Sequence, residues 1–170
     1  MAGAISLRAL VVGGSLGGLF AANLLLRSGW DVQLFEHSRG DLVARGAGII
    51  THPELFICLD RLGIAIGPSF GVDIPERIAF DRTGRIVGSL ALKQCLTTWG
   101  RLYELLRAAF PNDCYHLGHT LQRVDTTSDA VTATFANGLT ARGDLLIGAD
   151  GIRSAVRAQL LAAARPRYAG

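Results

Sequence analysis

The chain has 170 residues, of which 49% are hydrophobic and 18% are charged, and its formal net charge is +3. This length and composition are typical of one globular domain with a sizeable core, and they exclude an intrinsically disordered chain. The 17 basic residues are scattered and form no run interleaved with aromatic side chains, so we expect no nucleic acid partner.

The cysteines Cys58, Cys95 and Cys114 are far apart and form no C-x-x-C pair. An odd number of widely spaced cysteines is typical of free thiols in a reducing compartment rather than of a disulfide framework. We therefore expect a cytoplasmic protein.

Residues 9–26 carry no charge, and this run reaches the lower length limit of a transmembrane helix. Glycines crowd its first half, however, and Ser15 and Asn23 interrupt it. A strand, a glycine turn and a helix account for this composition better than a membrane span does. We therefore expect no membrane partner.

The first elements form one strand–helix–strand unit. The stretch Leu7–Val12, apolar except for Arg8, predicts a buried strand, apolar side chains at helical spacing predict a helix over Leu16–Arg27, and DVQLFE (31–36) predicts a second strand. After a polar loop, Pro53 fits the first position of a short helix that Gly63 ends.

The middle of the chain predicts a β-rich insertion over residues 70–95, approximately. Its sequence RIAFDRTGRIVGSL is typical of a hairpin with Asp81–Gly84 at the tip. A helix is expected over residues 99–110, and Thr97 or Thr98 is suited to cap it.

The last third of the chain predicts mostly strands. Asn137–Gly138 is a hairpin signal, DLLIGAD (144–150) predicts a buried strand, and a helix is expected over Ser154–Ala163. The whole pattern predicts an α/β fold: a Rossmann-like parallel sheet with helices, plus part of a second β region.

The stretch VVGGSLGGLF (11–20) carries the pattern G-x-S-x-x-G from Gly13, with Ser15 at the second glycine position. Such a turn lets a diphosphate approach the backbone N–H groups at the helix start, here Leu16–Gly18. Glu36 ends the next strand and is suited to bind both ribose hydroxyls of an adenosine. The pattern predicts a dinucleotide site, with an ordinary strand–helix turn as the alternative, and it leaves NAD and FAD both open.

A second feature is DLLIGADGIRSAVR (144–157), a buried strand followed by Asp150–Gly151 and a helix. Together with VVGGSLGGLFAANLLLRSGWDVQLFE and RGAGI (45–49), it makes the chain resemble the FAD-dependent aromatic-ring monooxygenases of the para-hydroxybenzoate hydroxylase type. The sequences of the stretches GGSLGGL, TTWGRLYELL and RPRYAG are similar to those of the dihydroxypyridine hydroxylase branch of this family. The resemblance implies that residues 1–170 are an FAD-binding domain, the N-terminal portion of a larger enzyme whose second FAD motif would follow residue 170.

The resemblance also implies a non-covalent FAD site in which each group of residues meets one part of the cofactor. Residues at the diphosphate would be Gly13, Ser15, Leu16, Gly18, Asp150 and Gly151. Residues at the adenosine would be Glu36, His37 and Val124. Residues along the ribityl chain and toward the isoalloxazine would be Arg45, Gly46 and Gly48.

The activity that the resemblance implies is a monooxygenation. NAD(P)H would reduce FAD, and O₂ would add to the reduced flavin, whose hydroperoxide would hydroxylate a small aromatic or N-heteroaromatic ring. Because the cofactor carries this chemistry, we assign no catalytic side chain. A flavin reductase or oxidase of the same fold and a non-catalytic FAD-binding module remain as alternatives. Activity of the segment alone and a homodimeric assembly stay open.

Trp99 departs from the family pattern, because many relatives have an FAD-contacting arginine at this position. We expect Trp99 to pack instead, with Arg101 as the nearest substitute for that arginine.

The stretch CYHLGH (114–119) brings Cys114, His116 and His119 close together in sequence, and these are metal-ligand types. On a strand, residues three apart point to opposite faces, so the two histidines are expected not to converge. We therefore expect no metal site.

Overall fold

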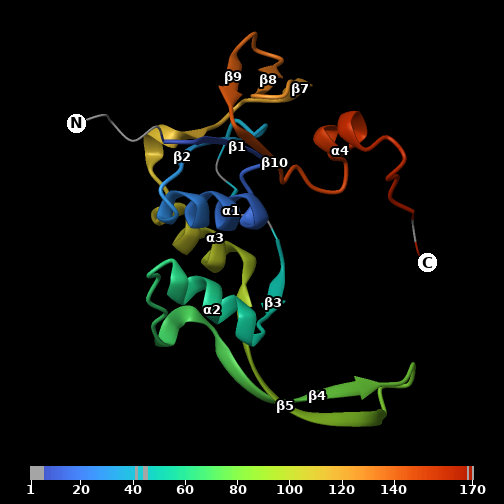
Figure 1. The fold of residues 1–170 in the computed structure, drawn as a ribbon. Coiled ribbons are helices and arrows are strands. Elements are labelled where there is room, and N and C mark those ends of the chain that lie inside the picture. The colour runs from blue at the N-terminus through green and yellow to red at the C-terminus, as the bar shows by residue number, and fades with distance from the viewer. Residues whose placement is uncertain (1–5, 41, 44–45, 168, 170) are drawn as a thin grey trace. The chain divides into compact units, whose positions relative to one another are not determined.

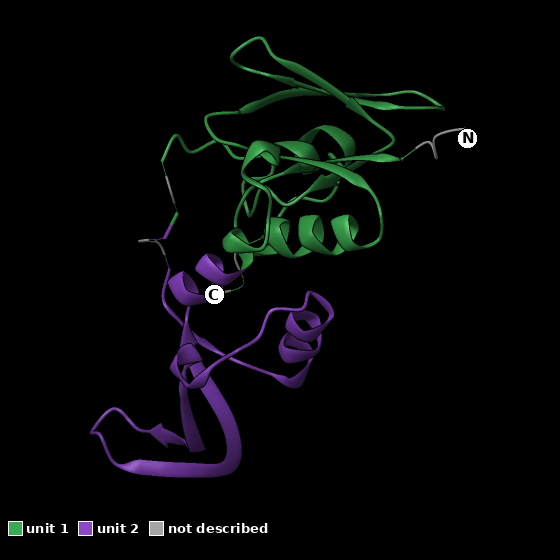
Figure 2. Ribbon diagram, turned by 90° about the vertical axis from the view of Figure 1, so that its left-hand side faces the viewer, with its two compact units in different colours: residues 1–42, 106–170 green, residues 43–105 purple. Residues whose placement is uncertain are grey.

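The computed structural model describes residues 6–40, 42–43, 46–167 and 169. The chain divides into two compact units, residues 1–42 with 106–170 and residues 43–105 (Figure 2). Among the described residues, no helix is long and apolar enough to cross a membrane.

A four-stranded parallel sheet forms the centre of the first unit (Figure 1). Its strands, in spatial order, are β10 (Leu145–Gly148), β1 (Arg8–Val12), β2 (Asp31–Phe35) and β6 (Tyr115–His116). β1 lies inside this sheet, and its residues Ala9–Val12 are at most 4% exposed. Burial on both faces explains why these four residues of the strand are all apolar.

Helix α1 (Leu16–Arg27) connects β1 to β2 and covers one face of the sheet (Figure 1). It buries Leu19 and Ala22 against the strands, together with Asn23. The Asn23 amide donates to the Leu19 carbonyl at 2.9 Å and to the Leu106 carbonyl at 3.0 Å. A buried polar side chain is thus satisfied inside an otherwise apolar interface.

The other face of the parallel sheet packs on a second, antiparallel sheet. It consists of β7 (Leu121–Thr126), β8 (Val131–Phe135) and β9 (Thr140–Gly143) (Figure 1). Leu10 of β1 and Phe35 of β2 share one core cluster with side chains of β7 and β8. The hairpin predicted at Asn137–Gly138 is confirmed, since Gly138 turns the chain between β8 and β9 with φ +84°.

Two short helices complete this unit. The 3₁₀ helix η2 (Asn112–Cys114) precedes β6, and α4 (Ala155–Leu160) follows β10. The helix expected over Ser154–Ala163 is therefore shorter than predicted. Val156 is the buried residue of α4, whereas Leu161 is 62% exposed, so packing supports only the first turns.

The second unit contains a three-stranded antiparallel sheet. Its order is β3 (Gly48–Ile50), β5 (Ile86–Thr98) and β4 (Val72–Phe80). Helix α2 (Pro53–Arg61) and the 3₁₀ helix η1 (Pro68–Phe70) lie between β3 and β4 in sequence, and helix α3 (Trp99–Ala108) follows β5. The sequence did not predict β3, whose three residues are too few for a periodic pattern.

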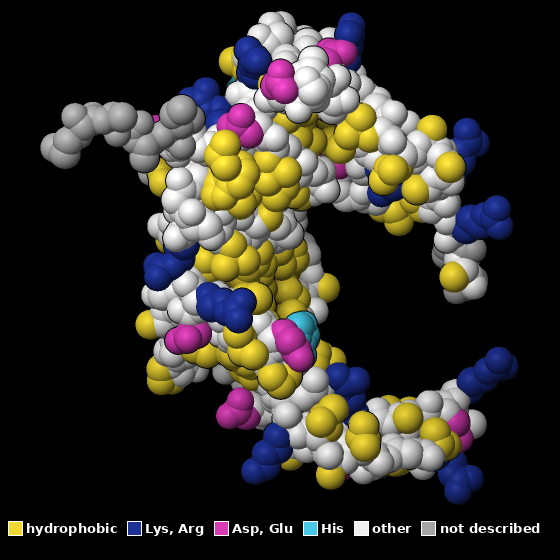
Figure 3. Space-filling view, viewed as in Figure 1, with side chains coloured by type: hydrophobic (Ala, Val, Ile, Leu, Met, Phe, Trp, Pro, Cys, Tyr) yellow, Lys and Arg dark blue, Asp and Glu magenta, His cyan; other side chains and the backbone are white. Residues whose placement is uncertain are grey.

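The hairpin of β4 and β5 turns at the predicted tip. Asp81 Oδ1 accepts the backbone N–H groups of Thr83 and Arg85, and Gly84 takes φ +83°. Apolar side chains along this hairpin are exposed, Val72 at 68% and Ile86 at 62% among them (Figure 3). α3 begins as expected, since Thr98 Oγ1 accepts the Arg101 N–H at 3.1 Å.

Candidate functional site

The turn between β1 and α1 leaves no room for side chains at its first and last glycines. Gly13 has φ +109°, and a Cβ there would collide with the carbonyl of Ala149, the residue after β10. A Cβ on Gly18 would collide with the Gly13 carbonyl oxygen. Both glycines are buried, so they allow the tight turn and the close packing of α1 on the strands that a dinucleotide turn needs.

The middle of the turn is tied to the end of β2. The Gly14 N–H donates to Glu36 Oε2 at 2.7 Å, and the Ser38 N–H donates to Glu36 Oε1 at 2.8 Å. His37 Nδ1 lies 3.0 Å from the same Oε1 atom. Glu36 is only 3% exposed and is not among the residues that line the neighbouring pocket, so in this structure its carboxylate anchors the turn, and its contact with a ribose remains a prediction.

The charge state of Glu36 follows from these contacts. Burial on its own raises the pKa of the carboxyl, but the N–H bonds from Ser38 and Gly14 outweigh it. The net pKa lies below the usual 4.5, so the group is a carboxylate at neutral pH. A carboxylate accepts hydroxyl donors and repels a phosphate, which suits an adenosine ribose without a 2′-phosphate.

The start of α1 has neither a side-chain cap nor an acidic residue of its own. Ser15 is the N-cap residue in extended conformation, yet its hydroxyl makes no capping bond to the helix. The first turn of α1 contains no acidic side chain. Backbone N–H groups from Leu16 onward, helped by the helix dipole, are therefore suited to an anion.

A pocket of about 300 Å³ lies beside this turn, inside the first unit. Three of its lining residues, Gly13, His37 and Asp150, belong to the predicted FAD site. Sequence patterns missed others, namely Phe35, His119, Thr120, Leu121 and Arg153. Of these, Thr120 and Leu121 come close because β6 pairs with β2 and brings the following loop to the end of β2, a long-range pairing that the sequence does not reveal.

The expectation about the two histidines is wrong. β6 ends at His116, and Gly118 with φ +74° turns the chain, so the His116 and His119 ring centroids lie 5.8 Å apart. Burial, and then the neighbouring His119, lower the pKa of His116. Among the described residues no group of three or more ligand-type side chains gathers, and Phe35 stacks on His116 instead, with centroids 4.9 Å apart.

The predicted residues after β10 have a capping role in the structure. Asp150 accepts hydrogen bonds from the Ser154 hydroxyl at 2.5 Å and from the Ala155 N–H at 2.6 Å, at the start of α4. Gly151 takes φ +79° directly beside it. The Asp150 carboxylate thus holds the chain that borders the pocket.

Val124 lies in β7 and is 9% exposed. Its backbone N–H donates to Gln159 Oε1 at 3.0 Å, so that group is already engaged. Its contact with adenine remains a prediction.

The predicted flavin-end residues belong to the second unit, and Arg45 lies outside the described residues. Gly46 has φ +100°, and a Cβ on it would collide with the Trp99 side chain. The Trp99 N–H donates to the Ala47 carbonyl at 3.0 Å, and Gly48 pairs with Thr98. Trp99 therefore packs under this segment, as expected, and stacks on Tyr103 at 5.0 Å with an interplanar angle of 9°.

Arg101, the expected substitute for the missing arginine, is only partly paired in this unit. Its Nη2 donates to Ser69 Oγ at 3.3 Å, and its Nη1 lies 3.7 Å from Glu104 Oε2. Its Nε is buried without a hydrogen-bond partner. The guanidinium therefore has a donor to spare, but the structure gives it no role.

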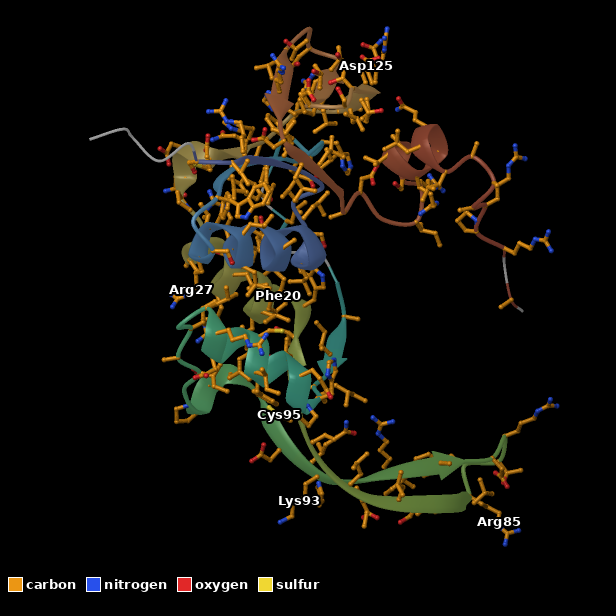
Figure 4. All side chains as sticks on the ribbon, in the orientation of Figure 1. Phe20, Arg27, Arg85, Lys93, Cys95 and Asp125 are labelled. Atoms are coloured by element: carbon orange, nitrogen blue, oxygen red, sulfur yellow. The ribbon has the colours of Figure 1, made fainter. Side chains whose placement is uncertain are left out.

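A larger cavity of about 740 Å³ lies inside the second unit, between the start of α2 and the hairpin. Its lining combines the apolar Phe56 and Ile74 with Lys93 and Cys95, the latter two labelled on β5 in Figure 4. Burial, and then the neighbouring Asp73, raise the pKa of the Cys95 thiol. The thiol is therefore protonated at neutral pH and is no nucleophile.

The first unit fits the adenosine diphosphate half of a dinucleotide. A Cβ on Gly13, Gly14 or Gly18 would collide with the protein itself, an uncapped helix start offers N–H donors, and a buried carboxylate follows β2. These donors and acceptors match a diphosphate and a ribose respectively.

Comparison with known proteins agrees with this assignment. No protein-family model matches the chain. The chain is 34% identical to 2,6-dihydroxypyridine 3-monooxygenase of Paenarthrobacter nicotinovorans, in an alignment that covers 96% of this chain and 41% of that protein. It is 33% identical to 6-hydroxynicotinate 3-monooxygenase of Pseudomonas fluorescens, in an alignment that covers 96% of this chain and 45% of that protein. The chain spans less than half the length of these relatives.

Solved structures give the same result. The fold matches 2,6-dihydroxypyridine-3-hydroxylase from Arthrobacter nicotinovorans with a TM-score of 0.87 and 36% identity, over 97% of this chain and 42% of that one. It also matches Klebsiella pneumoniae HpxO complexed with FAD and uric acid, with a TM-score of 0.78 and 27% identity, over 92% and 42% respectively. The chain is thus a homologue, over less than half their length, of the FAD-dependent monooxygenases of aromatic and heteroaromatic rings.

Proposed function

We propose that this chain is the FAD-binding part of a monooxygenase that uses NAD(P)H and O₂ to hydroxylate a small aromatic or N-heteroaromatic ring. The single observation that carries the proposal is the closed glycine turn, with Gly14 bonded to buried Glu36 beside an uncapped helix start. The named relatives and the FAD-complexed neighbour support the choice of FAD over NAD.

Each part of the first unit has a defined task in this proposal. The turn Gly13–Gly18 binds the diphosphate through backbone N–H groups, and the Glu36 carboxylate accepts the ribose hydroxyls. His37 borders the adenosine pocket, and Asp150 with Gly151 keeps the opposite wall in place through the α4 cap. When bound, FAD supplies the redox and oxygen-transfer chemistry, so the protein's own work is binding, orientation and exclusion of water.

The flavin-end assignment is the less supported part of the proposal. Gly46 and Gly48 are exposed on a segment that Trp99 supports, which leaves their backbone groups accessible to a ligand. The glycines permit a flat ring to approach closely. Arg45 stays in the proposal on the family resemblance alone.

We also propose a cytoplasmic location and a homodimer. The free cysteines Cys58, Cys95 and Cys114 support a reducing compartment, and the exposed apolar side chains of β4 and β5 support self-association. Light scattering after size-exclusion chromatography tests the homodimer: a monomeric mass at micromolar concentration rejects it.

Titration of the chain with FAD, followed by visible absorbance and flavin fluorescence, tests the proposed binding. We expect saturable binding that Gly13→Ala abolishes. Gly138→Ala is the matched control, because Gly138 also has positive φ but faces open space away from the pocket. Binding by both variants alike would contradict the proposed site.

Addition of NADPH or NADH to the FAD-loaded chain under air then tests the catalytic part. Oxidation of the reductant together with hydroxylation of a hydroxypyridine supports the monooxygenase. Oxidation without product favours a reductase or oxidase, and binding without oxidation favours a non-catalytic FAD module.

A further inference from the structure

The peptide that follows Gly14 is held from its buried side by a residue far away in sequence. The Tyr115 hydroxyl on β6 donates to the Gly14 carbonyl oxygen at 3.0 Å, across 101 positions of the chain. The two groups are buried, and a Cβ on Gly14 would collide with this hydroxyl. The glycine turn and the tyrosine are therefore fitted to each other.

The Tyr115 ring is itself fixed in place. The Arg107 guanidinium carbon lies 4.3 Å from the ring centroid, and the Phe110 ring meets it edge-on at 6.4 Å. Arg107 in turn donates to the Phe110 carbonyl at 3.0 Å and to Asn112 Oδ1 at 2.7 Å. With only 7% of Tyr115 exposed, the hydroxyl cannot swing away from the turn.

This contact determines where the next N–H group points. The Gly14 carbonyl and the Ser15 N–H belong to one planar peptide and point in opposite directions. When the carbonyl is directed inward to Tyr115, the Ser15 N–H is directed outward, at the start of α1. Glu36 completes the arrangement by taking the preceding N–H, that of Gly14.

We propose that Tyr115 is a positioning residue for the diphosphate: its hydroxyl holds the Gly14–Ser15 peptide so that the Ser15 N–H meets a phosphate oxygen. The inference rests on the proposed function and adds to it a residue outside every motif of the dinucleotide pattern. Tyr115 does not touch the ligand and acts through Gly14. Without the hydroxyl, the buried carbonyl loses this partner and the peptide can rotate.

The test compares two ligands on the variant Tyr115→Phe, by isothermal titration calorimetry. ADP contains the diphosphate and adenosine lacks it, so a defect in peptide orientation affects only ADP. We expect Tyr115→Phe to weaken ADP about fivefold, the value of one neutral hydrogen bond, and to leave adenosine within about twofold. FAD is expected to weaken by the same factor as ADP.

Tyr103→Phe is the matched control, because Tyr103 is only 1% exposed and this variant also removes one hydroxyl from a buried tyrosine. It is expected to leave the affinities for both ligands unchanged. Gly14→Ala is a second variant, since its Cβ would displace the Tyr115 hydroxyl from the carbonyl. A Cβ there would also crowd the Cβ of Glu36, so this variant is expected to weaken ADP more than it weakens adenosine, and it serves should Tyr115→Phe fail to fold.

The outcomes separate the two proposals. Unchanged ADP affinity in both variants, or equal losses for ADP and adenosine, overturns the role of Tyr115 and leaves the proposed function standing. Failure of the unaltered chain to bind either FAD or ADP overturns the proposed function and this inference together.

Discussion

The glycine turn at residues 13–18 and the glycine segment at residues 46–48 are similar in backbone and different in what surrounds them. Gly13 and Gly46 both have positive φ, and neither has room for a Cβ. At Gly13 the space is filled by the Ala149 backbone, whereas at Gly46 it is filled by the Trp99 side chain. The first turn is therefore fixed by the sheet itself and the second by one replaceable residue.

The difference shows two ways in which a fold can shape backbone for a ligand. Ala149 follows β10, which pairs along its length with β1, so moving it would disrupt the parallel sheet. Trp99 can be exchanged without changing a strand pairing, although it stacks on Tyr103. A second substitution should therefore not restore the stability lost by a substitution at Gly13, whereas a substitution of Trp99 should restore part of the stability lost at Gly46.

Gly13→Ala is expected to have the largest effect. Positive φ costs a residue with a Cβ about 1–2 kcal/mol, and collision with an immobile backbone adds about 1–3 kcal/mol. We expect the free energy of unfolding to fall by about 2–5 kcal/mol and FAD binding to be lost. Urea unfolding and an FAD titration measure the two effects.

Gly138→Ala separates the two contributions, because Gly138 has φ +84° and open space where a Cβ would lie. Its cost should be about 1–2 kcal/mol from the backbone alone. Equal costs at Gly13 and Gly138 would mean that the Ala149 backbone yields, and the contrast with Gly46 would then disappear.

Glu36→Gln is expected to have the next largest effect. Two N–H donors, from Gly14 and Ser38, face the two carboxylate oxygens, and an amide offers only one oxygen. One buried N–H therefore loses its acceptor, at a cost of about 1–3 kcal/mol. Urea unfolding at pH 7 measures this loss, and an unchanged midpoint would show that the anchor does not stabilise the turn.

The same residue predicts a pH dependence. Its pKa in the folded protein lies below the usual 4.5, so its contribution to stability is complete above about pH 4.5. The contribution is lost as the pH falls through the lowered folded-state value. Melting temperatures from pH 7 down to pH 3 should therefore converge for the unaltered chain and Glu36→Gln, and parallel curves would contradict this role.

Gly46→Ala is expected to cost about 2 kcal/mol, because strain and collision again combine. In a Trp99→Ala background the collision is removed, so the cost should drop by about 1 kcal/mol and leave the strain. A double-mutant cycle by urea unfolding measures this coupling. Additive costs would show that the indole does not determine the room at Gly46.

The sequence predicted the parts of the fold whose signals are local. β1, α1 and β2 follow from one apolar run, one helical period and one glycine turn, and the hairpin tip follows from Asp81 and Gly84. The helix α4 was overestimated, because propensity extends to Ala163 while packing ends with Val156. Local patterns do not reveal where the core ends.

The candidate site divides in the same way. The predicted Gly13, His37 and Asp150 line one pocket, since each follows a strand of the same parallel sheet. The approach of His116 to His119 was missed because one glycine, Gly118, turns the chain after two strand residues. No periodic pattern encodes such a turn, nor the pairing of β6 with β2 that brings the Tyr115 hydroxyl to the turn.

Ser15→Gly is expected to have the smallest effect, and it tests directly whether the turn at residues 13–18 binds through its backbone alone. The Ser15 hydroxyl makes no capping bond to α1, and a glycine at the N-cap costs only a few tenths of a kcal/mol relative to serine. If the turn binds through backbone N–H groups, removing the hydroxyl should lower FAD affinity less than about tenfold, the limit for one neutral hydrogen bond. Complete loss of FAD binding would mean that the first turn binds through a side chain rather than through its backbone. The turn at residues 13–18 would then depend on one side chain, as the segment at Gly46 depends on Trp99, and the two stretches would no longer differ in this respect.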